Sequence, residues 1–110
     1  MHEMGLAAEM CEIIRKHARG RPVSGVDIDI GRFSGVNRES FAFCAQSIFE
    51  TELSPDIEIR MRDLPGTFVC SCGCEYKAAD LSDPCPECGG YDRTAAGGDE
   101  LILTSIEIEE

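Results

Sequence analysis

The sequence has no apolar run long enough to cross a lipid bilayer. Its longest apolar stretches, residues 41–45 and 101–103, are much shorter than the run of about 20 residues that a membrane-spanning helix needs. The N-terminus also lacks the basic segment followed by an apolar segment that marks a secretory signal. We therefore expect a globular protein that does not insert into membranes and stays in the cytoplasm.

Basic residues are scarce, since 10 lysines and arginines face 21 aspartates and glutamates and the formal net charge is −11. Excess negative charge repels phosphate backbones and anionic membrane surfaces, so nucleic-acid binding is not expected. The acidic side chains need no role beyond keeping the protein soluble. A chain of 110 residues has little room for an enclosed active site, and no nucleophile with a neighbouring base stands out. We expect no catalytic residues and no enzymatic activity.

Apolar residues recur at helical spacing in two segments. The first carries Leu6, Met10, Ile13, Ile14 and His17 and ends at Gly20 and Pro22, and the second carries Phe41, Cys44, Ala45, Ile48 and Phe49. Asn37 precedes the second segment, where its side-chain oxygen can cap a helix N-terminus. Cys11 and Cys44 lie among these apolar residues, so we expect them in the core. The place of His17 favours a packed or helix-end histidine over a metal ligand.

Three further segments alternate apolar and polar residues with the period of two that is typical of strands. Their inward positions are predicted to be Val26, Ile28 and Ile30, then Ile57, Ile59 and Met61, and finally Ile102, Thr104, Ile106 and Ile108. Residues 70–98 lack this periodicity and contain five cysteines. We predict an α+β fold with two helices on a small three-stranded sheet, formed by residues 1–69 plus 99–110. Residues 70–98 are predicted to form an inserted zinc-ribbon-like lobe with four cysteine ligands.

Seven cysteines in a chain without a secretory signal indicate metal or redox chemistry rather than disulfides. Cys85-Pro86-Glu87-Cys88 has the spacing with which two thiolates hold one tetrahedral metal ion, and Gly89 lets backbone N–H groups turn towards sulfur. A redox dithiol would be expected in a strand-to-helix setting, which this motif lacks. Four thiolates saturate zinc, so we expect a structural zinc site, although rubredoxin-like iron suits the same thiolates.

Segments along the whole chain match one known family. They are the Met1-His2-Glu3-Met4 start, the Ile28-Asp29-Ile30-Gly31 strand end, the double-cysteine lobe and the closing residues 98–101 and 105–107. Together they resemble the HypA/HybF family of hydrogenase maturation factors. The resemblance implies a nickel chaperone for [NiFe]-hydrogenase assembly, with zinc in the four-cysteine lobe and nickel at the N-terminus. It implies as partners the GTPase HypB, the hydrogenase large-subunit precursor and, in some organisms, urease maturation proteins.

By this resemblance His2 is the indispensable nickel ligand, and Met1 and Glu3 contribute main-chain atoms. The terminal amine, the His2 amide nitrogen and the imidazole can close fused chelate rings, and nickel(II) favours such nitrogen-rich planar sets. Without the resemblance, His2 would be interpreted as an ordinary mobile terminal residue. Some family members carry an acidic nickel-supporting residue at the position of Asn37, which can cap a helix but adds no charge.

The upstream half of the zinc site can be chosen in two ways. Zinc half-sites usually space their ligands by two to four residues, which selects Cys70 with Cys74. The family's Cys-Gly-x-x-aromatic turn instead matches Cys72, Gly73 and Tyr76, and a glycine after the cysteine lets N–H groups reach sulfur. We therefore favour Cys72 and keep Cys74 as the alternative. The predicted zinc ligands are Cys70, Cys72, Cys85 and Cys88.

Two functions of different classes follow from these patterns. The first is a nickel metallochaperone that binds nickel(II) at His2 and delivers it during [NiFe]-hydrogenase maturation. The second is a zinc-ribbon module that binds other proteins without transferring nickel. Nickel binding by untagged protein, lost on His2→Ala, is expected only of the first.

Overall fold

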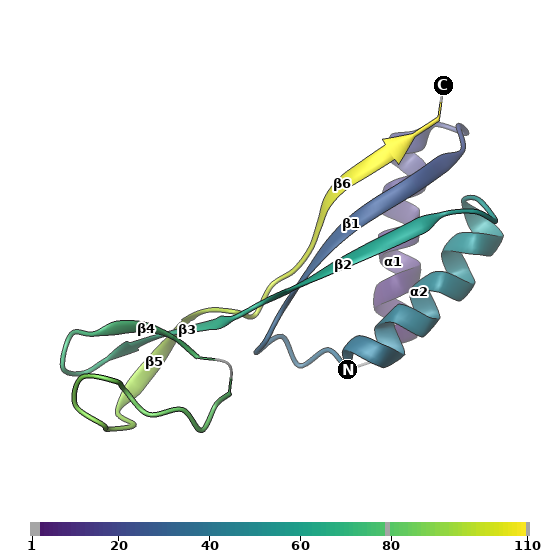
Figure 1. The fold of residues 1–110 in the computed structure, drawn as a ribbon. Helices are drawn as coiled ribbons and strands as arrows, with labels where there is room; N and C mark the ends of the chain where they lie inside the picture. The colour runs from purple at the N-terminus through teal and green to yellow at the C-terminus, as the bar shows by residue number, and fades with distance from the viewer. Residues whose placement is uncertain (1–2, 79, 110) are drawn as a thin grey trace.

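The computed structural model describes residues 3–78 and 80–109, which form two small sheets joined end to end by a narrow neck (Figure 1). The molecule is elongated, 53 × 25 × 18 Å. Its elements are α1 (Glu3–Ala18), β1 (Val23–Gly31), α2 (Arg38–Glu52), β2 (Glu58–Leu64), β3 (Gly66–Cys70), β4 (Glu75–Ala78), β5 (Arg93–Gly97) and β6 (Leu101–Ile108). The strand orders are β2-β1-β6 and β4-β3-β5. The predicted α+β class is confirmed.

The first sheet is built around a β1-α2-β2 crossover. β1 pairs in parallel with β2 and antiparallel with β6, so β1 is the central strand. Both helices lie on the same face of this sheet (Figure 1). The core lies between the helices and the sheet and includes Ile14, Val26, Ile28, Phe41 and Phe49, each at most 1% exposed. This unit therefore has a continuous apolar interior of its own.

The helix ends follow the sequence signals. α1 ends at Ala18, and Gly20 follows with a φ of +83°, a conformation that suits glycine. Asn37 caps α2 as predicted, because its Oδ1 accepts a hydrogen bond of 3.0 Å from the Ser40 amide. Of the two cysteines predicted for this core, Cys11 is 2% exposed and Cys44 packs against the core at its edge.

The buried face of α1 is rotated from the predicted one. The helix buries Ala7, Met10, Cys11, Ile14 and Ala18. Ile13 is 50% exposed, and His17 is exposed in the last turn of the helix. The prediction that the helix face carrying these two residues packs inward is therefore wrong. The buried stripe consists largely of small residues, which let α1 lie close to its neighbours. His17 is therefore a helix-end histidine and not a packed one.

β6 contains a bulge that the period-two pattern did not predict. Asp27 pairs with Ser105 but Ile28 pairs with Leu103, so Thr104 has no partner in the ladder. Because of this extra residue, Leu101 and Leu103 pack against the core on one side of the bulge, and Ile106 and Ile108 do so on the other. The predicted inward positions of Ile102 and Thr104 are wrong: Ile102 is 46% exposed, and Thr104 is exposed too.

The other face of the first sheet carries ion pairs between register partners of β1 and β2. Arg60 donates to Asp27 at 2.7 and 3.1 Å, and Arg62 donates to Asp29 at 3.0 and 2.6 Å. Asp29 is only 7% exposed. A Cβ at Gly25 would lie 3.0 Å from the Arg60 guanidinium, so the glycine leaves room for it. Each of these two arginines lies opposite its aspartate, so the pairs favour the observed register of the parallel strands.

The neck is a backbone-to-backbone contact between three passes of the chain. A Cβ at Gly31 would lie 2.1 Å from the Gly98 oxygen, and a Cβ at Gly98 would lie 2.6 Å from the Gly66 Cα. A Cβ at Gly66 would overlap the Phe33 ring, and the Phe33 amide donates to the Gly98 oxygen at 2.6 Å. Only residues without side chains allow the passes to meet so closely.

We predict that Gly98→Ala disrupts the neck. Gly98 has a φ of +101°, and its added Cβ would press on the Gly66 backbone. The matched control is Gly35→Ala, because Gly35 has a φ of +77° with nothing within 4 Å of its Cβ. Left-handed strain should cost each variant about 1–2 kcal/mol, and the clash should cost Gly98→Ala a further ~1–3 kcal/mol. Equal urea unfolding midpoints for the two variants would contradict this.

We predict that the Asp27–Arg60 pair makes stability depend on acidity. The hydrogen bonds from Arg60 and then Ser105 lower the pKa of Asp27 to about 2, below its ordinary 3.8. A lowered pKa means that the contribution is complete above about pH 4 and is lost as the pH falls towards about 2. Asp27→Asn should therefore lower the urea midpoint at pH 7, with the difference shrinking near pH 2. Asp63→Asn, which breaks an exposed pair with Arg38, should change the midpoint little at either pH.

Candidate metal centre

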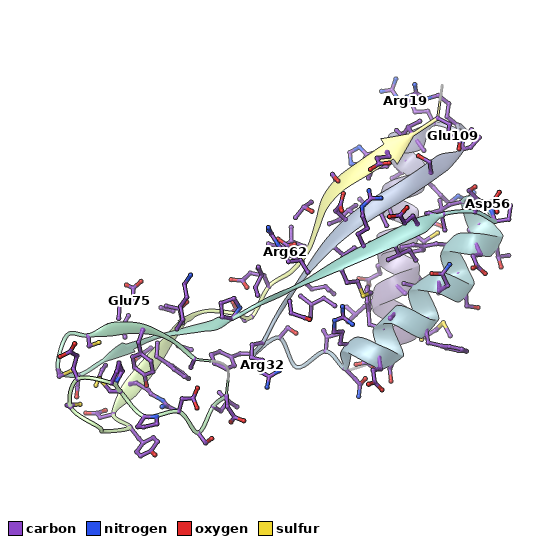
Figure 2. The ribbon with its side chains drawn as sticks, viewed as in Figure 1. Arg19, Arg32, Asp56, Arg62, Glu75 and Glu109 are labelled. Carbon is purple, nitrogen blue, oxygen red and sulfur yellow. The ribbon has the colours of Figure 1, made fainter. Side chains whose placement is uncertain are left out.

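The second sheet brings four cysteine sulfurs together. Cys70 ends β3, Cys72 lies in the turn before β4, and Cys85 and Cys88 lie in the loop between β4 and β5. These four sulfurs lie within 4.8 Å of one another. Figure 2 shows sulfur atoms gathered at the end of this lobe, away from the helices.

The dimensions of the cluster suit a tetrahedral ion. The sulfurs of Cys70 and Cys88 are 3.5 Å apart, and those of Cys72 and Cys85 are 3.7 Å apart. With zinc–sulfur bonds of about 2.3 Å, the sulfurs of a regular tetrahedron lie about 3.8 Å apart. The donor set and its spacing therefore fit zinc. The predicted alternative ligand, Cys74, lies outside this group of four.

Both halves of the cluster use the same turn. Cys72 and Cys88 each precede a glycine with positive φ, +94° at Gly73 and +73° at Gly89. In each turn the backbone N–H two residues after the cysteine donates a hydrogen bond to its sulfur. Such N–H groups stabilise negative charge on sulfur and orient it. The upstream turn therefore keeps this geometry although it is one residue shorter than the Cys-x-x-Cys spacing of the downstream half.

The thiol pKa values in the cluster are pushed apart. The backbone N–H groups of Cys88 and Glu87 lower the pKa of Cys85 to about 6, against the opposing effect of burial. For Cys72, the N–H of Cys74 lowers the pKa, but hydrogen bonds with neighbouring thiols and burial outweigh it and raise the pKa to about 12. Without a cation the cluster therefore holds protons between its sulfurs. A metal ion that binds all four sulfurs must displace those protons.

A small aromatic cluster supports the metal lobe. The Phe68 ring lies 5.0 Å from Phe33 and 5.7 Å from Tyr76, measured between centroids. The Arg93 guanidinium lies 4.1 Å from the centroid of the Phe68 ring and donates to the Tyr76 hydroxyl at 2.9 Å. Arg93 also donates to two carbonyls within residues 81–83, in the loop that leads to Cys85. This anchoring role of Arg93 was not predicted, because no local pattern marks it.

The predicted nickel ligands lie at the start of the chain. Met1 and His2 lie outside the described residues. Glu3 begins α1, and its Oε2 accepts a hydrogen bond of 3.2 Å from the Asn37 amide. The contact joins the start of α1 to the N-cap of α2.

The fold and the cysteine cluster define a small α+β protein with a lobe in which four cysteine sulfurs are arranged to hold a metal ion. Residues 1–108 match the family model HypA, described as hydrogenase/urease nickel incorporation metallochaperone. Relatives named hydrogenase maturation factor HypA are 36% identical in Geobacter metallireducens and 34% identical in Rhodopseudomonas palustris, each over 99% of this chain and 100% of the relative. The chain belongs to the HypA family of nickel-incorporation metallochaperones in hydrogenase maturation.

Solved structures support the fold independently. The solution structure of the Ni metallochaperone HypA from Helicobacter pylori superposes with a TM-score of 0.66 at 21% identity, over 98% of this chain and 97% of that one. A second HypA solution structure gives a TM-score of 0.68, also at 21% identity, over 99% and 97% of the two chains. At this identity the likeness concerns the fold. Among residues 3–78 and 80–109, no helix is long and apolar enough to span a membrane.

We predict that removing the metal unfolds the lobe but not the helix-bearing unit. The lobe's buried cluster is small and includes the ligands Cys70 and Cys85, whereas the first sheet and both helices share a larger core. On chelation, hydrogen-exchange protection should fall in residues 70–88 and persist in α1, α2 and β1. Adding zinc back should restore it. Persistent protection of residues 70–88 without metal would show that the apolar cluster around Phe68 is enough to keep the lobe folded. The same measurement tests the predicted boundaries of the lobe at residues 70 and 98.

Proposed function

We propose that this protein binds nickel(II) at its N-terminus and delivers it to a [NiFe]-hydrogenase large-subunit precursor. In the proposed site His2 supplies its imidazole and amide nitrogen, while Met1 and Glu3 supply the terminal amine and a main-chain nitrogen. The observation that carries the proposal is the match of residues 1–108 to a family of nickel-incorporation metallochaperones. The nitrogen-rich chemistry of the Met-His-Glu start supports it.

The four-thiol lobe is proposed to hold zinc as a structural ion. The proposed ligands are Cys70, Cys72, Cys85 and Cys88, whose sulfurs lie within 4.8 Å of one another. Four thiolates complete the coordination of zinc and leave no position for a substrate. The bound ion would therefore fix the lobe and take part in no reaction. The N–H groups that reach the sulfurs of Cys72, Cys85 and Cys88 would stabilise the thiolates around it.

The protein would act through partners and not as an enzyme. The family description covers hydrogenase and urease nickel incorporation. On the family resemblance, the proposed partners are the maturation GTPase HypB, the hydrogenase precursor and urease maturation proteins. These steps would take place in the cytoplasm. Nickel would be the cargo, bound and released without chemical change.

Nickel binding by untagged, zinc-loaded protein tests the nickel proposal. We expect about one nickel per chain by isothermal titration calorimetry, and loss of this binding both on His2→Ala and on adding residues before Met1. The matched control is His17→Ala, because His17 is the other histidine of the chain and is exposed at the end of α1. Its nickel binding should equal that of the native chain.

The same experiment separates the two functions considered from the sequence. Undiminished nickel binding by protein with a blocked N-terminus would contradict the N-terminal site. Complete absence of nickel binding in the native chain, with zinc retained, would favour a zinc-ribbon module that binds proteins without moving nickel. Nickel lost on His17→Ala but not on His2→Ala would place the site on α1 instead.

A further inference from the structure

The metal lobe contains one thiol more than a tetrahedral site uses. Cys70, Cys72, Cys74, Cys85 and Cys88 all carry free sulfurs, and four of these sulfurs form the compact cluster. Taking the proposed zinc site as its basis, we propose that Cys74 is a reserve ligand, which occupies the metal position of Cys72 whenever the Cys72 sulfur leaves the ion.

The hairpin between β3 and β4 places Cys74 beside a ligand. The Cys70 amide donates to the Cys74 oxygen at 2.8 Å, and the Gly73 amide donates to the Cys70 oxygen at 2.9 Å. The ladder ends at Val69 and Glu75, so Cys70 and Cys74 are the next opposing positions, where the turn begins. Side chains of opposite residues lie on the same face, with Cβ atoms about 4.5–5.5 Å apart. The two thiols therefore face the same side of the hairpin.

The Cys74 side chain lies partly buried at the edge of the site. Cys74 is half-buried and packs against the cluster formed by Phe68, Cys70, Tyr76, Ala78 and Cys85. Its sulfur lies 3.8 Å from the Glu75 oxygen, a weak contact that a metal–sulfur bond can replace. Cys72, in contrast, is exposed in the turn. Cys72, the proposed ligand, is therefore more exposed to water than Cys74, the proposed reserve ligand.

Each of the two thiols satisfies one requirement of a zinc half-site. Cys72 has Gly73 after it, so a backbone N–H reaches its sulfur. Cys74 has the usual spacing from Cys70, with three residues between the two cysteines. Cys70 and Cys72 are separated by one residue only, which is short for a zinc half-site, and the same turn supplies Cys74 as a further thiol. Cys88 has no such substitute in its own turn, since Gly89 and Gly90 follow it.

The exchange balances without a co-reactant. The metal–sulfur bond to Cys72 breaks and a metal–sulfur bond to Cys74 forms. The Cys74 thiol gives up its proton, and the departing Cys72 thiolate takes one up, through water. The ion stays divalent with four thiolates, and no sulfur is oxidised. The lobe would therefore keep its metal while its most accessible upstream sulfur is detached.

X-ray absorption of zinc-loaded full-length protein tests this proposal by counting the sulfurs bound to zinc. The native chain and Cys74→Ser should show four sulfurs. Cys72→Ser should also show four, because Cys74 replaces the lost ligand. The double variant, Cys72→Ser with Cys74→Ser, should show three sulfurs and bind zinc about tenfold or more weakly than Cys72→Ser. Cys88→Ser, the matched control without a spare thiol in its turn, should show three.

Results that would overturn the reserve role differ from those that would overturn the zinc site. If Cys72→Ser shows three sulfurs and the double variant also shows three, Cys74 does not replace Cys72. The proposed zinc site would stand, but the reserve role of Cys74 would be overturned. Three sulfurs in Cys74→Ser with four in Cys72→Ser make Cys74 the resident ligand and also overturn the proposal. Fewer than four sulfurs in the native chain would overturn the proposed site itself.

A kinetic measurement covers the case in which Cys72→Ser does not fold. Cys74→Ser retains the four proposed ligands, so it should fold with zinc like the native chain. Its zinc should pass to an excess of chelator about tenfold faster, because no thiol closes the position that Cys72 vacates. Equal rates of zinc loss from Cys74→Ser and the native chain would contradict a reserve ligand.

Discussion

The contact between Gly31, Gly66 and Gly98 is the constraint on which the two-sheet arrangement depends. β1 ends there, β2 passes into β3 there, and the chain returns there from β5 to β6. This return lets β6 pair with β1, although the whole metal lobe lies between the two strands in the sequence. The first sheet therefore receives its third strand from beyond the lobe. Close backbone passage at one point keeps the two units connected without a shared apolar core.

The helix-bearing unit and the metal lobe are stabilised by different interactions. The helix-bearing unit buries two helix faces against one sheet, so apolar burial is its main source of stability. The metal lobe has one small cluster in which Cys70 and Cys85 take part, together with the Arg93 contacts that tie the long loop to the sheet. Because its buried apolar cluster is small, we expect such a lobe to depend on a bound metal ion for its order.

Local signals predicted the elements of this protein, while features set by distant partners could not be predicted from the sequence. Asn37 as a cap and the glycines after Cys72 and Cys88 follow from the chemistry of neighbouring residues. The bulge at Thr104 depends on how β6 meets β1, so period-two alternation placed Ile102 on the wrong face. The exposure of Ile13 likewise depends on which stripe of α1 meets the sheet and α2.

In the metal lobe, too, features set by neighbouring residues could be predicted, and features set by distant residues could not. The cysteines and their turns could be found from spacing and glycine, whereas the contact between the rings of Phe33 and Phe68 joins residues that are far apart in the sequence. The choice between Cys72 and Cys74 could not be settled by spacing, because a two-residue step is short for a half-site. In the structure the Gly73 turn directs an N–H to the Cys72 sulfur, and that sulfur belongs to the group of four, which supports the proposed choice of Cys72.

A structural metal and a transferred metal place opposite demands on their ligands, and the proposed sites meet them with different donors. Four soft thiolates favour zinc and close its coordination, which suits an ion that must stay. A terminal amine, an amide nitrogen and one imidazole suit nickel(II). Glu3 belongs to the first unit and the clustered cysteines to the second. Placing the sulfur ligands beyond the neck would keep the cargo ion from being captured by the site that stabilises the fold.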